Sequence, residues 1–321
     1  MKRFSTVAAA LVLMTVTACG SGGSDGSGES DDGTITMGFA QVGAESGWRT
    51  ANTESIQQAA EDAGVDLQFS DAQQKQENQI RAIRSYIQQD VDVIAFSPVV
   101  ETGWDAVLLE AQRADIPVIL TDRAIDSDDT SLYETFLGSD FVEEGRKAGQ
   151  WLVDNAEGET NVVELQGTTG AAPAIDRKEG FEEVIADNSD IEIIATQTGD
   201  FTRSGGKEVM EAFLRSHDNI DVVYAHNDDM GLGAIEAIRA AGMEPGEDIQ
   251  IITVDAVEAG MEALAAGEIN FIVECNPLLG DQLMELAEQV VAGEEVPERV
   301  VVEETTFTQE EAEAALPDRQ Y

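Results

Sequence analysis

The sequence predicts an α/β fold built from two Rossmann-like lobes, each with a parallel sheet. A chain of 321 residues, 42% of them hydrophobic, is long enough for about two domains with real cores. From Thr34 onward, short apolar runs alternate with amphipathic segments of helical spacing, a pattern that favours parallel sheets with right-handed crossovers. Roughly ten such runs are present, which is the upper limit for one open, twisted sheet, so two sheets are expected.

Two successive series of elements support the two lobes. The first series has expected strands at residues 35–42, 65–71, 91–98 and 116–123, with helical spacing at 76–88 and 104–114. The second has expected strands at residues 161–167, 191–199, 221–228 and 249–256, followed by apolar runs at 270–276 and 299–307. We see no literal sequence repeat between the two series.

The charge of the chain excludes nucleic acid as a partner. Its formal net charge is -46, from 18 Lys and Arg against 64 Asp and Glu. Phosphate binding needs clustered cations, and an anionic membrane surface would repel such a chain as well. The acidity is compatible with a generally acidic proteome or with a high-salt habitat, and the sequence leaves both open.

The N-terminus has the pattern of a secretory lipoprotein signal. MKRFSTVAAALVLMTVTAC carries two cations, an apolar run too short to span a bilayer, and small residues before Cys19. Its end, V-T-A-C, resembles a bacterial lipobox, so we expect a signal peptide at residues 1–18 and a lipid anchor on Cys19. The alternative is a plain cleaved signal. Residues 19–33 read as a flexible tether, and the remaining cysteine, Cys275, then has no disulfide partner.

Polar residues gather at the carboxyl ends of the expected strands, where open parallel sheets bind their ligands. They are Asp71, Ser97, Asp122, Arg123, Gln166, Asp200, Phe201, Asn227, Asp228 and Asp255. Any one of the short polar side chains could simply cap the following helix. Together, however, the carboxylates, amide and guanidinium suit a polyhydroxylated ligand, whose hydroxyls both donate and accept. Trp48, Trp104 and Phe201 could stack on a sugar face or pack in the core.

Several segments resemble the ribose-type periplasmic sugar-binding proteins of ABC transporters. DRAID, AIDRKEGF, GDFTRSGGKEVME, AHNDDM and TVDAVEAG carry this resemblance over essentially the whole chain from Thr34. ESGWRTA, QQKQENQIRA, SPVVETGW, NVVELQG and YAHNDDM further resemble the members that bind galactofuranose. The resemblance implies a type I periplasmic binding protein fold and a monosaccharide ligand, galactofuranose or a related sugar. It also implies an ABC transporter permease as partner, no cofactor, no enzymatic activity and a monomeric, extracytoplasmic protein.

The resemblance also implies a set of ligand-binding residues. The matching positions are Ser46, Trp48, Arg49, Asp122, Arg123, Arg177, Phe201, Asn227 and Asp255. The expected hinge carries Glu274, Cys275 and Asn276 where relatives often have a neutral amide, so Glu274 joins the set as a departure from the family pattern. His226 and Asp228 are expected behind the site rather than in contact with the ligand.

Domain limits follow from the family fold. We expect one lobe at residues 34–137 and 275–302 and the other at 138–274 and 303–321, joined by a three-crossing hinge. Each lobe would cover one face of the sugar, so closure of the lobes completes the binding site.

Three other functions are considered. A carbohydrate-active enzyme is possible on an α/β fold, but the chain has no G-x-S-x-G, H-E-x-x-H or C-x-x-C motif and only two histidines. A transcription regulator would carry a basic helix-turn-helix in place of a signal and an acidic tether. A sensory receptor that reports sugar occupancy to a membrane signalling protein stays open.

The charge generates a testable expectation about salt. Self-repulsion among carboxylates weakens the folded state, and salt screens it. We therefore expect the thermal midpoint of residues 34–321 to rise between about 0.05 and about 1 M NaCl. A flat or falling midpoint would show that the carboxylates are too dispersed to matter.

Overall fold

The structure, a computed structural model, describes residues 33–321, of which Thr34–Tyr321 form one compact unit. The expected signal peptide, Cys19 and the expected tether up to residue 32 lie outside the described residues. Among the described residues, no helix combines the length and the apolar character that crossing a membrane requires.

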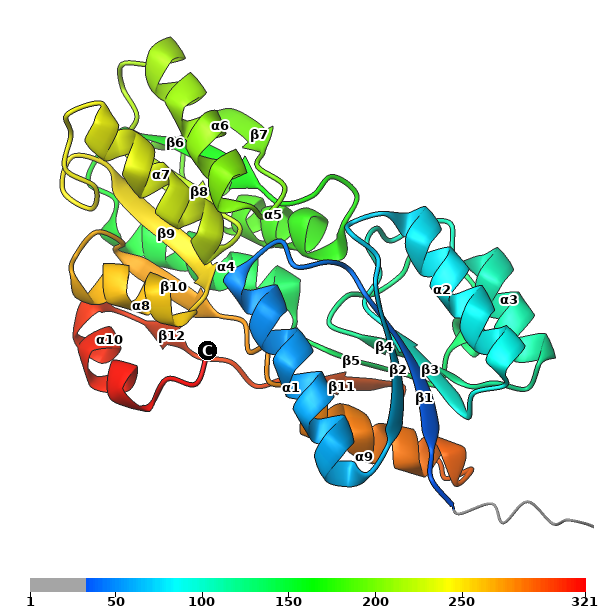
Figure 1. The fold of residues 1–321 in the computed structure, drawn as a ribbon. Helices are drawn as coiled ribbons and strands as arrows, with labels where there is room; N and C mark the ends of the chain where they lie inside the picture. The colour runs from blue at the N-terminus through cyan, green and yellow to red at the C-terminus, as the bar shows by residue number, and fades with distance from the viewer. Residues whose placement is uncertain (1–32) are drawn as a thin grey trace, which may run out of the picture. The chain divides into compact units, whose positions relative to one another are not determined.

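The first sheet has six strands, all parallel, in the order β11-β5-β4-β3-β1-β2 (Figure 1). Its strands are β1 (Thr36–Gln41), β2 (Asp66–Asp71), β3 (Val93–Phe96), β4 (Val118–Thr121), β5 (Thr135–Gly138) and β11 (Arg299–Val301). Adjacent residues of β1 face opposite sides, since Phe39 joins one core and Ala40 the other.

Helices cover both faces of the first sheet (Figure 1). Ile56 of α1 (Gly47–Ala63) and Leu283 of α9 (Gly280–Val291) pack with Phe39 on one face. On the other face lie Ile83 of α2 (Gln76–Gln89) and Leu108 of α3 (Asp105–Arg113). A short 3-10 helix, η1 (Thr130–Leu132), precedes β5.

The second sheet has the order β12-β10-β9-β8-β6-β7, and only β12 runs antiparallel to its neighbour. Its strands are β6 (Thr160–Gln166), β7 (Ile191–Thr198), β8 (Val222–Ala225), β9 (Gln250–Asp255), β10 (Phe271–Glu274) and β12 (Thr306–Phe307). One core includes side chains of α4 (Phe141–Asn155) and α5 (Ala172–Ile185). The opposite core includes those of α6 (Arg203–Ser216), α7 (Asp228–Ala240), α8 (Glu258–Ala265) and α10 (Gln309–Ala315), and η2 (Leu316–Asp318) follows.

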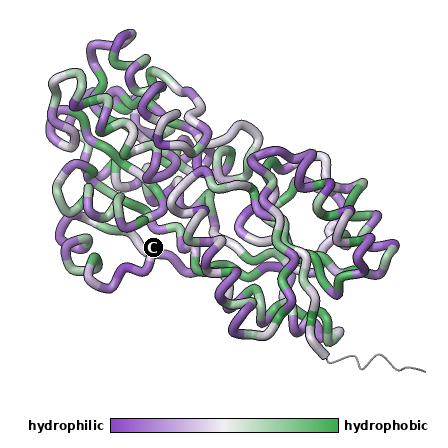
Figure 2. Tube along the Cα trace, in the orientation of Figure 1, coloured by the Kyte–Doolittle hydropathy of each residue, from purple (hydrophilic) through white to green (hydrophobic). Residues whose placement is uncertain are grey.

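The predicted fold class is confirmed, with two differences in the strands. Figure 2 shows hydrophobic residues along the strands of both sheets, as the apolar runs predicted. The four-residue strand β5 was not predicted, because Phe136 and Leu137 are its only large apolar residues and give no clear apolar run. The predicted strand at residues 299–307 is two strands, β11 in the first sheet and β12 in the second.

The chain passes between the two sheets three times. It leaves the first sheet after β5, returns between β10 and α9, and leaves again between β11 and β12. Ser139, Cys275 and Glu304 lie on these three connecting segments, one on each.

Close packing of α4 on α5 depends on two glycines. A Cβ added at Gly145 would lie 2.2 Å from the Arg177 carbonyl oxygen, and one at Gly180 would lie 2.0 Å from that of Val142. The backbones of the two helices therefore approach closely at the level of Arg177.

We expect Gly145→Ala to lower the free energy of unfolding by about 1–3 kcal/mol, because the helices would have to separate. The loss should appear although alanine in a helix otherwise gains about 1 kcal/mol over glycine. Urea unfolding measures it, with the exposed Gln150→Ala on the same helix as the control. Equal stability of Gly145→Ala and the wild type would show that the helices adjust freely.

Candidate functional site

A cavity with about 290 Å³ of empty space, part of it open to solvent, lies among the carboxyl ends of strands from both sheets. Its lining comes from the start of α1 (Glu45, Ser46, Trp48, Arg49), the end of β4 (Asp122, Arg123), α4 and α5 (Phe141, Pro173, Arg177), and the ends of β7 to β10 (Phe201, Asn227, Asp255, Cys275). Ligands in open α/β sheets bind at this end of the strands, so the cavity is the candidate site.

The structure brings nine of the ten predicted site residues to this cavity. They are Ser46, Trp48, Arg49, Asp122, Arg123, Arg177, Phe201, Asn227 and Asp255. The tenth, Glu274, is not part of the lining. Its carboxylate bonds instead to Arg319 at 2.9 Å and to the Tyr321 hydroxyl at 3.0 Å, and it accepts from Thr305 N. Glu274 therefore holds the C-terminal segment against β10.

One wall of the cavity is the ion pair of Arg49 and Asp122. Arg49 Nη2 lies 2.7 Å from Asp122 Oδ2, which also accepts a hydrogen bond from the Ser97 hydroxyl at 2.7 Å. Burial opposes ionisation of Asp122, but the guanidinium groups of Arg49 and Arg123 outweigh it and hold the pKa of that carboxyl below its usual range. Arg49 also donates to Glu45 Oε1 at 3.2 Å, so both side chains have fixed orientations.

Glu45 and Arg123 present unused bonding capacity in the cavity. Glu45 Oε1 lies 3.6 Å from Arg123 Nη2, while Glu45 Oε2 and Arg123 Nε are buried without a hydrogen-bond partner among the described residues. Burial, together with repulsion from Arg49, lowers the pKa of Arg123 to about 10, so it still carries its charge at neutral pH. A ligand hydroxyl can satisfy such an acceptor and donor.

Arg177 forms the opposite wall. Its Nε donates to Glu144 Oε2 at 2.6 Å, its Nη1 donates to the His226 carbonyl at 2.5 Å, and its Nη2 lies 3.8 Å from Asp255 Oδ1. Burial disfavours the charge, but Glu144 and Asp255 help to raise the pKa of Arg177 above its ordinary value. Burial raises the pKa of Asp255 well above its usual range, although Arg177 opposes this shift.

Each arginine of the cavity lies over an aromatic ring. The guanidinium carbon is 4.7 Å from the Trp48 ring centroid for Arg49. It is 5.4 Å from Phe201 for Arg123 and 5.1 Å from Phe141 for Arg177. Stacking of this kind stabilises the cation and fixes the ring. The cavity therefore offers apolar faces and polar edges in set positions.

The backbone is strained at three cavity residues. Asp122, Phe201 and Asp255 have φ values of 63°, 61° and 123°. Non-glycine residues in such conformations cost of order 1–3 kcal/mol and cluster at ligand sites. The Phe201 ring further requires glycine at Gly167, where an added Cβ would lie 1.9 Å from it.

Asn227 both caps a helix and supports the cavity. Its Oδ1 accepts from Met230 N at 3.0 Å at the start of α7, and its Nδ2 donates to the Phe201 carbonyl at 3.1 Å. Ser46 is likewise the N-cap of α1, accepting from Arg49 N at 3.1 Å. Asn227 and Ser46 therefore cap their helices and also line the cavity.

His226 and Asp228 lie behind the cavity, outside its lining. His226 Nε2 is 3.0 Å from Glu164 Oε1, and burial lowers the pKa of the imidazole. Asp228 accepts from Thr253 Oγ1 at 2.5 Å and from Val257 N at 2.8 Å, and burial raises its pKa to about 7. Both residues brace the strand ends that carry Asn227.

Trp104, another candidate ring, packs in the core of the first sheet. Its ring centroid lies 4.9 Å from that of Phe96, and its Nε1 donates to the Val100 carbonyl at 2.6 Å. The core interpretation of this tryptophan is the correct one.

Sequence reasoning missed four lining residues: Glu45, Phe141, Pro173 and Cys275. Glu45 directly precedes Ser46, so the first loop carried a usable signal. Phe141 follows the unpredicted strand β5, and Cys275 was predicted to lie at the hinge without a disulfide partner, not in the site. Its carbonyl accepts from Trp48 Nε1 at 2.6 Å.

Comparison with known proteins identifies the family. Residues 37–295 match the sequence profile of the periplasmic binding protein domain. The chain belongs to this family of periplasmic binding proteins. The galactofuranose-binding protein of Escherichia coli (strain K12) is 49% identical over 277 residues, which cover 85% of this chain and 87% of that protein.

Two solved structures extend the comparison. A Mycobacterium smegmatis protein in complex with β-D-fucofuranose has 67% identity and a TM-score of 0.88, covering 89% of this chain and 95% of that one. The binding protein of the arabinose ABC transporter from Shewanella sp. ANA-3, bound to α- and β-L-arabinofuranose, has 49% identity and a TM-score of 0.87, covering 89% and 96%. Since the relatives and the fold are those of substrate-binding proteins, the chain is a binding protein and not an enzyme.

Proposed function

We propose that this protein captures a monosaccharide in its furanose form, with galactofuranose as the preferred sugar, and delivers it to the permease of an ABC transporter. The observation that carries the proposal is the cavity, in which ion-paired arginines, carboxylates and three aromatic rings face one small space. Hydroxyl groups that both donate and accept suit such edges, and the C–H face of a sugar suits the rings.

The charges of the cavity favour an uncharged sugar. Arg49 and Arg123 are both close to Glu45 and Asp122, and Arg177 is paired with Glu144. The carboxylates therefore balance the guanidinium groups, and no excess positive charge is left to receive a phosphate or a uronic acid.

The ligands named for the relatives support a five-membered ring. Galactofuranose, fucofuranose and arabinofuranose share that ring and differ in the exocyclic arm. Fucofuranose lacks the terminal hydroxyl of galactofuranose, and arabinofuranose lacks the terminal carbon. We infer that the ring and its hydroxyls, rather than the arm, decide which sugars enter the site.

Two closing lobes are part of the proposal, with limits at residues 34–137 and 275–302 for one and 138–274 and 303–321 for the other. The assignment of β11 to the first sheet and of β12 to the second supports these limits. Hydrogen bonds beside the cavity support closure of the lobes. Gly47 N donates to Asp229 Oδ2 at 2.8 Å, and Glu101 N donates to the Gly170 carbonyl at 2.9 Å. Both bonds connect segments that follow strands of different sheets.

An extracytoplasmic position is proposed with lipid attachment at Cys19. The family supports the compartment, and the V-T-A-C segment supports the lipid. The acidic segment at residues 20–33 would then separate the binding domain from the membrane.

Titration with sugars tests the binding proposal. We expect galactofuranose to bind residues 34–321 more tightly than glucopyranose, since a site shaped around a furanose leaves polar groups unpaired against a chair. Glu45→Gln should weaken binding by about tenfold to a hundredfold, because a hydrogen bond to a charged group contributes roughly 1.5–3 kcal/mol. Asp255→Asn should weaken it less, by up to about tenfold, because a hydrogen bond to a neutral group contributes roughly 0.5–1.5 kcal/mol. Calorimetry gives the affinities.

The matched control is Glu295→Gln, which removes an exposed carboxylate far along the chain from the lining residues. It should bind like the wild type. Glucose bound more tightly than galactofuranose, with both cavity variants unchanged, would contradict the substrate and the site together.

A cell fractionation experiment tests the anchor. Cys19→Ala in the full chain should leave the protein unprocessed at that site or release it from the membrane, because the tether offers no apolar surface to hold it there. Ser24→Ala within the tether is the control. Normal processing and full membrane retention of Cys19→Ala would count against lipid attachment.

A further inference from the structure

Glu304 connects the three segments that run between the two sheets. Its Oε1 accepts a hydrogen bond from the Ser139 hydroxyl at 2.5 Å and one from Asn276 N at 3.0 Å. Ser139 follows β5, Asn276 follows β10, and Glu304 itself lies between β11 and β12. A single carboxyl group therefore fastens all three segments at one point.

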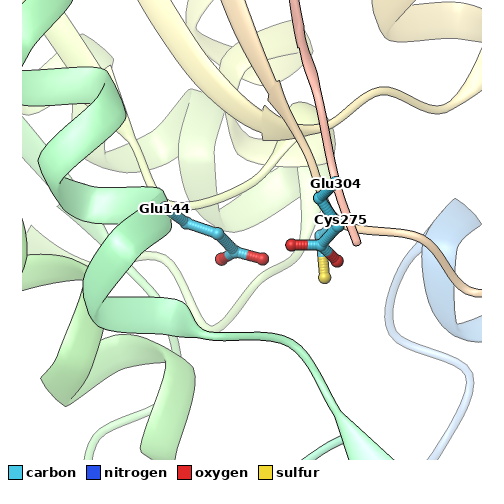
Figure 3. Close-up of side chains that lie close together, drawn as sticks. All are labelled: Glu144, Cys275 and Glu304. Atoms are coloured by element: carbon cyan, nitrogen blue, oxygen red, sulfur yellow. The ribbon is translucent and has the colours of Figure 1, made fainter. Parts of the chain in front are cut away.

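A second carboxyl group points at the same place. Glu144, on α4, has ligand-type atoms within 4.8 Å of those of Glu304 and Cys275, and Figure 3 shows the three side chains directed toward one another. Glu144 Oε2 is bonded to Arg177, whereas Glu144 Oε1 is buried and has no hydrogen-bond partner among the described residues. A buried carboxylate oxygen normally accepts a hydrogen bond, so a donor is expected beside Glu144 Oε1.

The charges of the cluster identify that donor. Glu144 is paired with the guanidinium of Arg177, whereas the Glu304 carboxyl has no ion-pair partner among the described residues. Burial raises the pKa of the Cys275 thiol well above its usual range, so the thiol stays neutral. One negative charge is in excess at a largely buried point. Two carboxyl groups so close together cannot both ionise cheaply, and a proton between them removes the excess charge.

We propose that Glu304 keeps its proton at neutral pH and shares it in a hydrogen bond with Glu144 Oε1, and that this proton holds the three connecting segments in the arrangement that surrounds the cavity. Release of the proton places a second negative charge beside Glu144 and loosens the junction. Burial, then the charge of Glu144, raises the pKa of Glu304 to about 9, against the lowering effect of its bonds to Ser139 and Asn276.

Other charged groups lie near Glu144 and Glu304. Lys147 Nζ, on α4, donates to the Glu304 carbonyl at 3.2 Å, and Arg299 Nη2, on β11, donates to the Ser139 carbonyl at 3.0 Å. Further charged or titratable groups near the pair include Asp140, Glu143, Arg177, Asp255, Glu303 and the Cys275 thiol. Lys147 contacts the backbone carbonyl of Glu304, whereas the carboxyl group of Glu304 lies near Glu144, Ser139 and Asn276.

The junction is linked to the ligand site, and this link rests on the proposed sugar-binding function. Cys275 lines the cavity, and its carbonyl accepts the Trp48 indole N–H. Arg177 lines the cavity while bonded to Glu144. Loosening of the junction should therefore weaken sugar binding as well as folding.

The direction of the pH effect follows from linkage. The pKa of Glu304 is higher in the folded state than the ordinary value of 4.5. Its contribution to stability is complete below that ordinary value and is lost progressively as pH rises to about 9. One proton retained only by the folded state changes the folding equilibrium about tenfold per pH unit in that window.

The test compares the wild type with Glu304→Gln, since glutamine can keep the acceptor for Ser139 and Asn276 and can donate an N–H to Glu144 at every pH. Glu303→Gln removes the adjacent exposed carboxylate and is the control. Urea unfolding and galactofuranose titration are followed from about pH 5 to about pH 9. Infrared spectroscopy at neutral pH measures the carbonyl stretch of protonated carboxyl groups.

We expect the wild type and Glu303→Gln to lose stability relative to Glu304→Gln as pH rises, by up to about tenfold in the folding equilibrium per pH unit. Sugar affinity should fall in the same direction, and one protonated-carboxyl band should be missing only from Glu304→Gln. Parallel pH profiles, an unchanged band, or a stoichiometric metal ion at the cluster would overturn the proposal. Wild type that shows the expected band and stability profile but binds no sugar would refute the proposed function and leave the shared proton supported.

Discussion

The buried ion pair of Arg177 and Glu144 is the contact on which both the cavity and the junction between the sheets depend. Arg177 reaches Glu144 at 2.6 Å and the His226 carbonyl at 2.5 Å, so one side chain joins α5, α4 and the end of β8. Gly145 is required because the Arg177 carbonyl occupies the space of a Cβ. Removing one partner of such a pair leaves an uncompensated buried charge, which typically costs 3–5 kcal/mol. The pair thus constrains helix packing and the wall of the cavity together.

The other two arginines of the cavity are also held in place by buried ion pairs. Arg49 and Arg123 are held by Glu45 and Asp122 on one side and lie over Trp48 and Phe201 on the other. Their orientations are therefore set before a ligand arrives. Because ordering flexible side chains on binding costs free energy, a pre-oriented site binds a small polar molecule more tightly than a mobile one with the same groups. Positive φ values at Asp122, Phe201 and Asp255 are part of this preorganisation.

Much of the fold and the site could be predicted from sequence because both follow from local patterns. Apolar runs marked most strands, and parallel strands bring their carboxyl ends together, so strand-end residues such as Asp122 and Asp255 meet. Strand β5 gave no clear apolar run and was not found. Glu274 was predicted to reach the cavity, but its neighbour Cys275 does so instead, because successive side chains of an extended chain point to opposite faces. Which of the two side chains faces the cavity depends on the contacts of Glu274 with Arg319 and Tyr321, residues that lie far away in the sequence, so no local pattern predicts it.

His226, Asn227, Asp228 and Asp229 lie at the junction of β8 and α7, and they illustrate how a helix cap can also be a candidate binding residue. In a β-α unit the carboxyl end of the strand is the amino end of the helix, where backbone N–H groups need acceptors. Asn227 supplies one to Met230, yet its amide still has a free hydrogen and a free lone pair after bonding to Phe201. His226 and Asp228 point into the lobe and satisfy Glu164 and Thr253, which keeps the joint rigid. Helix initiation and the proposed ligand contact thus fall on the same residue, because the carboxyl end of the strand is also the amino end of the helix.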